Sequence, residues 1–291
     1  MMIVTENDIQ ILALLAHYYV LTREQIQRLC APHLVSGRSL RRRITKLRQA
    51  DYLFKHRVPV ALPGTNGAAP VYYLTKNGAE LLASYHDDGT YLATNTRNPR
   101  ADLLNHWIEI NNTRMMIEQA IAQQEEVVLE NWINEWETVN KSDHEKEHFY
   151  LQTKLSDNPP LSCSPDAGFV LSLRGHKKVF YLEQDLGTSS PKQIAARKTK
   201  GYAELANRKL HRKHFPETTL DNFTILFITP TAYRCQTMAE RIRTRPRPDL
   251  WLCIDQHDLT PESFLYGQIT WNHKGERGSI VKPVSTEVVT P

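Results

Sequence analysis

The sequence predicts an α+β protein: a small helical domain with a β-hairpin, followed by a larger α/β domain in which a mixed sheet is flanked by helices. Three observations support this class. The chain opens with three segments whose apolar residues recur at helical spacing, followed by two strand-like runs. Residues 87–101 are polar and turn-rich, as expected for a linker. Beyond them the predicted order is helix, strand, strand, strand, helix, strand, helix, strand.

These patterns give the expected domain boundaries. The N-terminal domain covers residues 1–86, the linker 87–101 and the α/β domain 102–270. Residues 271–291 have no clear periodicity and are expected to form a tail. A chain of 291 residues agrees with about two domains.

Three helices are expected in the N-terminal domain. The first runs from about Glu6 to His17, and the second begins at Thr22, which forms a capping-box pattern with Gln25. Pro32 and Gly37 mark the turn before the third helix, which Ser36 or Ser39 can cap. The inward positions of the first and third helices are Ile9, Leu12, Leu15, Leu40, Ile44 and Leu47.

The outer face of the third helix is strongly basic. Residues 37–48 carry six Arg or Lys and no acid, although the net charge of the whole chain is only +4. Such a concentration in a nearly balanced chain indicates a polyanion partner, and a solvated helix face is the bland alternative. The residues that the apolar stripe leaves outside are Arg38, Arg41, Arg42, Thr45 and Arg48.

A hairpin is expected after the third helix. Strand-like runs at 50–60 and 71–78 flank a loop rich in Gly, Pro and Ala, and a helix-like run closes the domain. Three helices followed by such a hairpin form a winged helix, which places its third helix in the major groove of double-stranded DNA. Arginines that meet phosphates release counterions and add affinity without sequence information. A winged helix used only for protein contact is the alternative.

The second domain is expected to contain three helices and five strands. A hairpin turn at 174–177 joins two of the strands, and the polar segment 143–161 is expected to be a loop. The helices are expected at 103–124, 190–210 and 232–245, and the strands at 127–140, 166–173, 178–186, 222–230 and 250–256.

A second basic run lies in this domain. Residues 192–213 are rich in Arg and Lys and contain a single acid, Glu204. We expect Lys200 and Arg208 of this run to contact DNA, unless the run is only a solvated helix face.

Three carboxylates gather on the predicted strand pair. Asp166 opens the first strand, and Glu183 and Asp185 end the second. Converging carboxylates are ligands for Mg²⁺ or Mn²⁺, which can activate water and stabilise charge at a phosphate. Asp166 and Glu183 are the expected metal ligands, and Lys198 on the next helix can lean back toward them. Capping of the backbone or pairing with Arg remains open for these acids.

Nothing in the sequence predicts a membrane or secreted protein. No run approaches the roughly 18 apolar residues that span a bilayer, and the start lacks the basic region of a signal peptide. Four scattered cysteines without a CxxC pair suggest reduced thiols in a cytoplasmic protein, rather than a zinc site or disulfides.

Together these features resemble the replication-relaxation family, which is associated with plasmid and mobile-element replication and DNA relaxation. The resemblance runs from about residue 6 to 235 and includes "LNHWIEIN", "PDAGFVL", "FYLEQDLGT" and "KTKGY". The strand pair is also similar to the core of the PD-(D/E)xK nuclease superfamily. By that pattern Asp166 matches the metal-binding Asp, Glu183 the acid on the next strand, and Glu135 the upstream acid. Asp185 stands where the superfamily has its Lys, so cleavage requires Lys198 to take that role.

The expected function is that of a DNA-binding protein of a plasmid or mobile element, acting in replication initiation, relaxation or mobilisation. Its expected partners are double-stranded DNA and proteins of those processes, with a homodimer left open and no membrane. Mg²⁺ or Mn²⁺ is the only cofactor considered. Two rivals stay open: an active Mg²⁺-dependent endonuclease, with Asp166, Glu183, Asp185 and Lys198 in catalysis, and a transcriptional regulator with a sensing or dimerising domain.

Overall fold

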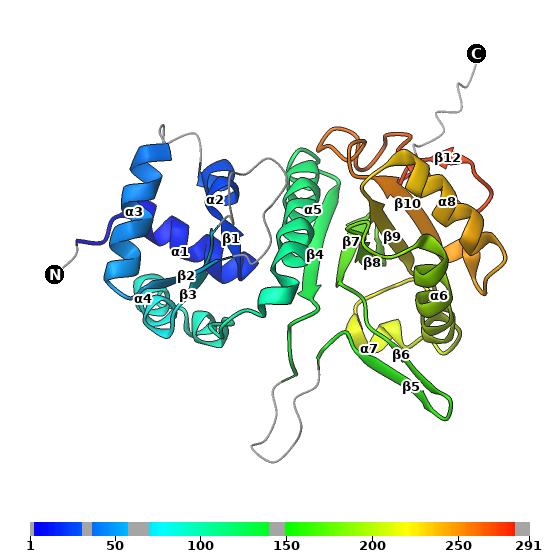
Figure 1. Ribbon diagram of the computed structural model, residues 1–291, viewed down its shortest axis with the longest axis horizontal. Coiled ribbons are helices and arrows are strands. Elements are labelled where there is room, and N and C mark those ends of the chain that lie inside the picture. Colours follow the sequence, from blue (N-terminus) through cyan, green and yellow to red (C-terminus); the bar gives the residue numbers. More distant parts are fainter. Residues whose placement is uncertain (1–2, 31–36, 58–69, 140–148, 283–291) are drawn as a thin grey trace. The chain divides into compact units, whose positions relative to one another are not determined.

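The computed structural model describes residues 3–30, 37–57, 70–139 and 149–282 and has the expected mixed α+β character (Figure 1). The chain divides into two compact units, Met1–Asn112 and Thr113–Pro291, with the boundary inside a long helix rather than in the predicted linker. In the described part of the chain, no helix is long and apolar enough to cross a membrane.

The first unit contains helices packed with a small antiparallel sheet. Its strand order is β1-β3-β2, and Leu53 pairs with Leu74 at the base of the β2–β3 hairpin. The helices are α1 (Glu6–Tyr18), α2 (Arg23–Cys30), α3 (Gly37–Gln49) and α4 (Lys76–His86). The strands are β1 (Leu21–Thr22), β2 (Leu53–Arg57) and β3 (Pro70–Leu74), and two short 3₁₀ turns follow, η1 (Gly89–Ala93) and η2 (Ala101–Leu103).

The predicted start of α2 and the predicted inner face of α3 are both confirmed. The backbone N–H of Gln25 donates to Oγ1 of Thr22 at 3.1 Å, and that of Thr22 donates to Oε1 of Gln25 at 2.9 Å. The predicted stripe of α3 is buried, so the other side of this helix is left to polar residues. The predicted cap Ser36 lies outside the described residues, and Ser39 is inside the helix rather than at its cap.

A buried carboxylate connects α1 with α3. Asp8 is fully buried, and its Oδ2 accepts hydrogen bonds from the backbone N–H and the hydroxyl of Thr5 at 3.0 and 2.9 Å. Nη1 of Arg43 donates to the same oxygen at 2.9 Å. Arg43 is therefore used to hold α3 in place.

Asp8→Ala is expected to lower the free energy of unfolding by about 2 kcal/mol, because the helix cap and the ion pair are lost together. The cost stays below that of a fully buried pair because the side chain of Arg43 is 27% exposed and can reach water. Urea unfolding followed by circular dichroism measures it. Glu6→Ala, which removes a neighbouring exposed acid, serves as the matched control and should change stability by less than about 0.5 kcal/mol.

The first half of α5 (Leu104–Ala122) is built into the first unit. Nδ2 of the buried Asn111 donates to the carbonyls of Tyr18 at 3.2 Å and Val20 at 2.6 Å. Nε2 of Gln25 donates to the carbonyl of Ile108 at 2.9 Å. These bonds satisfy buried polar groups where the chain turns from α1 into α2.

The second unit contains a seven-stranded mixed sheet with the order β12-β11-β10-β9-β8-β7-β4. The β4–β7–β8 part is antiparallel, and β8, β9 and β10 are parallel. The strands are β4 (Val127–Asn134), β7 (Ala167–Leu173), β8 (His176–Gln184), β9 (Thr224–Thr229), β10 (Trp251–Asp255), β11 (Thr270–Trp271) and β12 (Arg277–Gly278).

Helices supply the crossovers between the parallel strands, as such strands require. Glu183 contacts α6, whereas the next residue, Gln184, accepts a hydrogen bond from Thr113 of α5 at 2.7 Å, so these helices lie on opposite faces of the sheet (Figure 1). The remaining helical elements are α6 (Pro191–Asn207), α7 (His211–His214), α8 (Ala232–Arg243) and η3 (Pro248–Leu250).

The structure corrects two predictions for this unit. The segment predicted as a loop, 143–161, contains β5 (Thr153–Asp157) and the first half of its antiparallel partner β6 (Pro160–Cys163). Short strands with charged and proline residues carry little periodic signal, which explains the error. The predicted tail from residue 271 contributes to the main sheet, because β11 crosses that boundary and β12 pairs with it.

A buried histidine connects α7 with the sheet and with β5. One ring nitrogen of His214 lies 2.6 Å from the hydroxyl of Tyr181, and the other lies 2.9 Å from that of Thr153. Burial, together with the charges of His211 and Lys213, lowers the pKa of His214 from 6.5 to about 4. The imidazole is therefore neutral in the folded protein.

Acidification from pH 6.5 toward pH 4 is expected to destabilise the protein by roughly 3 kcal/mol through this group. In that range the unfolded chain binds a proton at His214 and the folded chain does not, so stability falls as the pH falls. Urea unfolding at a series of pH values measures the slope. His214→Gln should be less stable at pH 7.5 but should show a flatter pH profile. An unchanged slope in this variant would contradict the assignment.

Candidate nucleic-acid interface and acidic site

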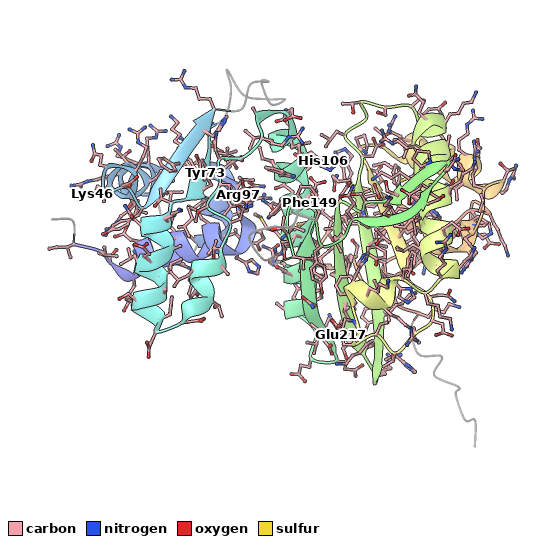
Figure 2. The ribbon with its side chains drawn as sticks, turned by 90° about the horizontal axis from the view of Figure 1, so that it is seen from below. Lys46, Tyr73, Arg97, His106, Phe149 and Glu217 are labelled. Carbon is pink, nitrogen blue, oxygen red and sulfur yellow. The ribbon has the colours of Figure 1, made fainter. Side chains whose placement is uncertain are left out.

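The exposed face of α3 is basic. Arg38, Arg41, Arg42, Thr45 and Arg48 are all exposed, as predicted, and Lys46 joins them. Figure 2 shows nitrogen-tipped side chains around this helix, with Lys46 labelled at its outer side. Within the part of the chain that the structure describes, Arg43 is the only basic residue of α3 in an ion pair. The other charges of this helix are available to a partner.

The second basic run is largely used within its own unit. Lys200 is exposed on α6, but Arg208 contacts Glu204 at 3.0 Å and donates to the carbonyl of Leu155 at 2.9 Å. Lys209 and Arg212 both contact Asp221 at 2.8 Å. Among the described residues, the exposed charges of this run that have no ion pair are Lys192, Arg197 and Lys200 in its first half and Lys213 at its end.

Asp166 and Glu183 lie side by side because β7 and β8 are antiparallel neighbours. Ala167 is paired with Leu182, and the backbone N–H of Gln184 donates to Oδ2 of Asp166 at 2.7 Å. Both carboxylates are buried, with Glu183 only 3% exposed. The local order of the sheet therefore places two acids together.

Lys198 reaches both acids from α6. Its Nζ lies 2.7 Å from Oε2 of Glu183 and 3.6 Å from Oδ1 of Asp166, and it donates to the carbonyl of Ser164 at 3.1 Å. The hydroxyl of Tyr202, one turn further along α6, donates to Oε1 of Glu183 at 2.5 Å. Lys198 and Tyr202 thus bind the two oxygens of the same carboxylate.

The charges in this cluster shift one another's pKa. Burial, followed by the neighbouring Asp166, raises the pKa of Glu183 to about 7, and Lys198 and Tyr202 oppose the shift. Burial lowers the pKa of Lys198, but the attraction of Glu183 and Asp166 outweighs it, so that its pKa lies above the ordinary value. The ammonium group of Lys198 offsets the electrostatic repulsion between the two buried carboxylates.

Asp185 does not join the cluster. Its Oδ1 accepts from the backbone N–H of Gly187 and from Nη2 of Arg234, both at 2.9 Å, and its Oδ2 accepts from Nε of Arg234. The expectation that Asp166, Glu183 and Asp185 converge is therefore wrong for Asp185. Asp185 follows the last residue of β8, and although its backbone N–H still donates to the carbonyl of Ile228 in β9 at 2.9 Å, its carboxylate is bound by Arg234 of α8.

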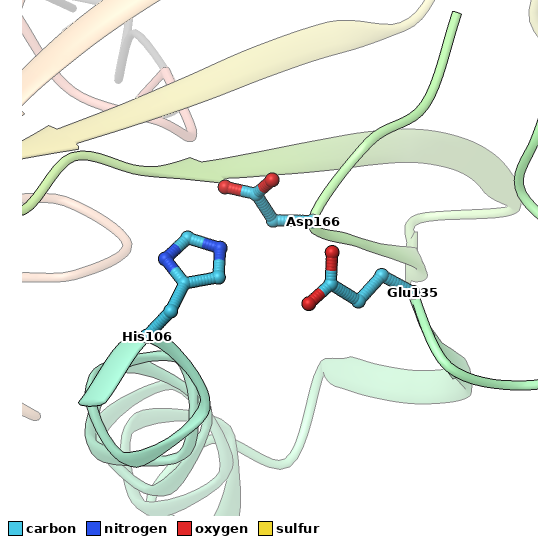
Figure 3. Close-up of side chains that lie close together, drawn as sticks. All are labelled: His106, Glu135 and Asp166. Carbon is cyan, nitrogen blue, oxygen red and sulfur yellow. The ribbon is translucent and has the colours of Figure 1, made fainter. Parts of the chain in front are cut away.

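Glu135 approaches Asp166 from the other side. It follows the end of β4, and its backbone N–H donates to the carbonyl of Asp166 at 3.1 Å. Each residue offers a carboxylate oxygen, and these atoms lie within 4.8 Å of one another (Figure 3). His106, also drawn in Figure 3, belongs to the first unit, whereas Glu135 and Asp166 both belong to the second.

The donor set fits a hard divalent cation. Glu135 and Asp166 supply carboxylate oxygens at the spacing that such ions bridge. Glu183 lies beside Asp166, but its two oxygens are bound by Lys198 and Tyr202. Two contributors were missed by pattern reasoning, Tyr202 and Arg234. The spacing of four between Lys198 and Tyr202 is the signal that could have placed both on the same face of α6.

Comparison with known proteins gives one match. The model of the family described as replication-relaxation matches residues 12–218, more than two thirds of the chain. The matched part contains α3, Asp166, Glu183 and Lys198, and it ends before Arg234. No curated protein and no solved structure matches.

Proposed function

The chain belongs to the replication-relaxation family, and from this premise we propose that it is a DNA-binding protein of a plasmid or other mobile element. It acts in replication initiation, relaxation or mobilisation. The observation that carries the proposal is the exposed basic face of α3, whose charges are not used for packing. Such a face is suited to the phosphates of duplex DNA.

The first unit is proposed to act as a winged helix. Three helices precede the β2–β3 hairpin, which is the order of that fold. In this arrangement α3 enters the major groove, and Arg38, Arg41, Arg42, Thr45 and Arg48 contact the backbone or the bases. Lys200 on α6 is proposed to add a weaker, sequence-independent contact, and Arg208 contributes less because Glu204 binds it.

A second candidate function, Mg²⁺-dependent DNA cleavage, is favoured by the cluster of Asp166, Glu183 and Lys198. The second unit has the order helix, three antiparallel strands, helix, strand, if β5 and β6 are treated as an insertion, and its β7–β8 pair carries the two acids that resemble the PD-(D/E)xK core. Lys198 is proposed to replace the lysine that Asp185 displaced, since it reaches the same acids from the next helix.

Glu135 and Asp166, with Glu183 as a further oxygen donor, are the residues that would hold Mg²⁺ or Mn²⁺. A bound ion of this kind polarises a phosphate and lowers the pKa of water. Lys198 would then place its positive charge next to the phosphate oxygens, while Tyr202 keeps Glu183 oriented. Asp185 has a structural role and is not proposed as a catalytic residue.

The test combines two measurements on the full chain. Gel-shift titration with a labelled duplex at several salt concentrations should show binding that weakens steeply with salt. Incubation with supercoiled plasmid, with and without Mg²⁺, then reports relaxation or nicking. Binding without nicking would support the role in replication or mobilisation and would contradict the nuclease function. The absence of detectable DNA binding at 50 mM salt would contradict both candidate functions.

A further inference from the structure

The guanidinium group of Arg234 binds both ends of the segment that connects β8 to α6. Arg234, in the first turn of α8, binds both carboxylate oxygens of Asp185, the first residue after β8. Its Nη2 also donates to the carbonyl of Ser189, the residue before the N-cap of α6. Both ends of the connection, residues 185–190, are therefore bound to the same side chain.

The pair is well shielded from water. The side chain of Asp185 is 4% exposed and that of Arg234 is 16% exposed. A bidentate Arg–carboxylate pair is stronger and more directional than an ordinary hydrogen bond, and shielding strengthens it further. The backbone N–H of Gly187 completes the coordination of Asp185, so the carboxylate has a fixed direction.

The connection sets the direction of α6. Ser190 and Gln193 form a capping box, and Pro191 begins the helix, so α6 is regular from its first residue. Lys198 lies eight residues after Ser190, which corresponds to about 12 Å along the axis. A tilt of roughly 10° at the N-terminus would therefore move Lys198 by about 2 Å on this helix geometry.

A shift of this size is comparable with the 2.7 Å length of the contact between Lys198 and Glu183, so it would displace the ammonium group from the carboxylate. Further along, α6 is packed closely at Gly201, where an added Cβ would lie 2.8 Å from the carbonyl of Ser162. The helix is thus fixed at two points, Arg234 before Lys198 and Gly201 after it.

From this geometry we infer that Arg234 is a positioning residue, which acts through Asp185 and the Ser189 carbonyl to hold Lys198 against Glu183 and Asp166. Asp185 stands at the position where the PD-(D/E)xK pattern has its lysine. Through Arg234 it also anchors α6, the helix that carries Lys198. The assignment of a role to Lys198 rests on the proposed nuclease function, whereas the placement of Lys198 by Arg234 does not.

The experiment measures the accessibility of Lys198 directly. The full chain is acetylated briefly with N-hydroxysuccinimidyl acetate, and the modification at each lysine is quantified by peptide mass spectrometry. Lys200, exposed two residues further on, is the internal reference. Cys253, 1% exposed in β10, reports loosening of the whole unit through its reaction with iodoacetamide.

Arg234→Gln is expected to raise the Lys198-to-Lys200 ratio at least fivefold and to leave Cys253 unreactive. Arg234→Lys, which keeps the charge but not the bidentate geometry, should give an intermediate ratio. Arg241→Gln, an exposed arginine of the same helix, is the matched control and should change nothing. If Arg234→Gln does not fold, Asp185→Asn should raise the Lys198-to-Lys200 acetylation ratio in its place. The double variant should show a ratio no higher than that of Arg234→Gln alone, because the two residues act through one contact.

An unchanged ratio in Arg234→Gln would overturn the inference. So would a joint rise at Lys198 and Cys253, since Arg234 would then stabilise the unit as a whole. Neither labelling result requires DNA or metal. A failure of the proposed function appears instead in the gel shift and the plasmid assay, so the two failures are distinguishable.

Discussion

Replacing Arg38, Arg41 and Arg42 by alanine is expected to weaken binding of duplex DNA by roughly 500-fold at 0.1 M salt, if each arginine neutralises one phosphate. The three side chains are exposed on α3, so their removal leaves the buried stripe of Leu40, Ile44 and Leu47 in place. The slope of log K against log salt should fall in magnitude by about 2.7, which is 0.9 for each lost contact. Fluorescence anisotropy from 50 to 300 mM salt gives both quantities.

A charge-matched variant distinguishes the effect of the basic face of α3 on DNA binding from the effect of net charge. Arg241, Arg243 and Arg245 lie at and beyond the end of α8, and their replacement by alanine removes the same three charges from the second unit. This control should retain affinity within a few-fold. Equal losses in both triple variants would mean that overall charge drives binding, and α3 would no longer be the proposed recognition helix.

In the presence of Mg²⁺, Lys198→Met is expected to reduce plasmid nicking at least 100-fold, and Asp166→Asn to do the same. Lys198 lies within reach of two carboxylates and would face a phosphate held there, and Asp166 is the acid shared by Lys198 and Glu135. Conversion of supercoiled to open-circular plasmid on agarose gels gives the rate. Lys274→Met, which removes an exposed lysine of the same unit outside both basic runs, should retain nicking.

Loss of stability has to be separated from loss of chemistry in Lys198→Met. This variant leaves the buried carboxylate of Glu183 without its cation, which destabilises the fold by about 3 kcal/mol or more. Adding Glu183→Gln removes that charge and should restore much of the melting temperature. Nicking should stay lost in the double variant and should be lower than in Glu183→Gln alone, which removes only the further oxygen donor. Recovery of nicking together with stability would show that Lys198 is only a structural counter-ion.

The sequence predicted the N-terminal elements well because each had a local signal. Thr22 and Gln25 have the spacing of a capping box, and Leu40, Ile44 and Leu47 have the spacing of one helix face. The same reasoning missed β5 and β6, whose pairing depends on contacts beyond their own residues. It also missed β11 and β12, which are two residues long and take their register from β10.

The candidate site was predicted in part for a similar reason. Asp166 and Glu183 were expected to meet because two adjacent strands joined by a short turn must be antiparallel. Asp185 was wrongly added, since spacing along an expected strand does not reveal where the strand ends or that an arginine 49 residues later binds the carboxylate. The reach of Lys198 was anticipated, but the hydroxyl of Tyr202 and the carbonyl of Ser164 are products of the tertiary fold.

The bonds of Asn111 determine how the molecule can be dissected. A fragment ending at residue 101, within the predicted linker, would lose the amide group that binds the carbonyls of Tyr18 and Val20 and would also lose the acceptor of Gln25. The carbonyl of Val20 and the side-chain amide of Gln25 would then lose their partners in α5, at roughly 1–3 kcal/mol each, whereas the carbonyl of Tyr18 would keep the backbone N–H of Val20. The shortest N-terminal fragment that keeps these bonds extends through Asn111 into α5. A chimera that exchanges the first unit between related chains should therefore be joined after Asn111. The first half of α5 then stays with α1 and α2, which it binds, and with α3.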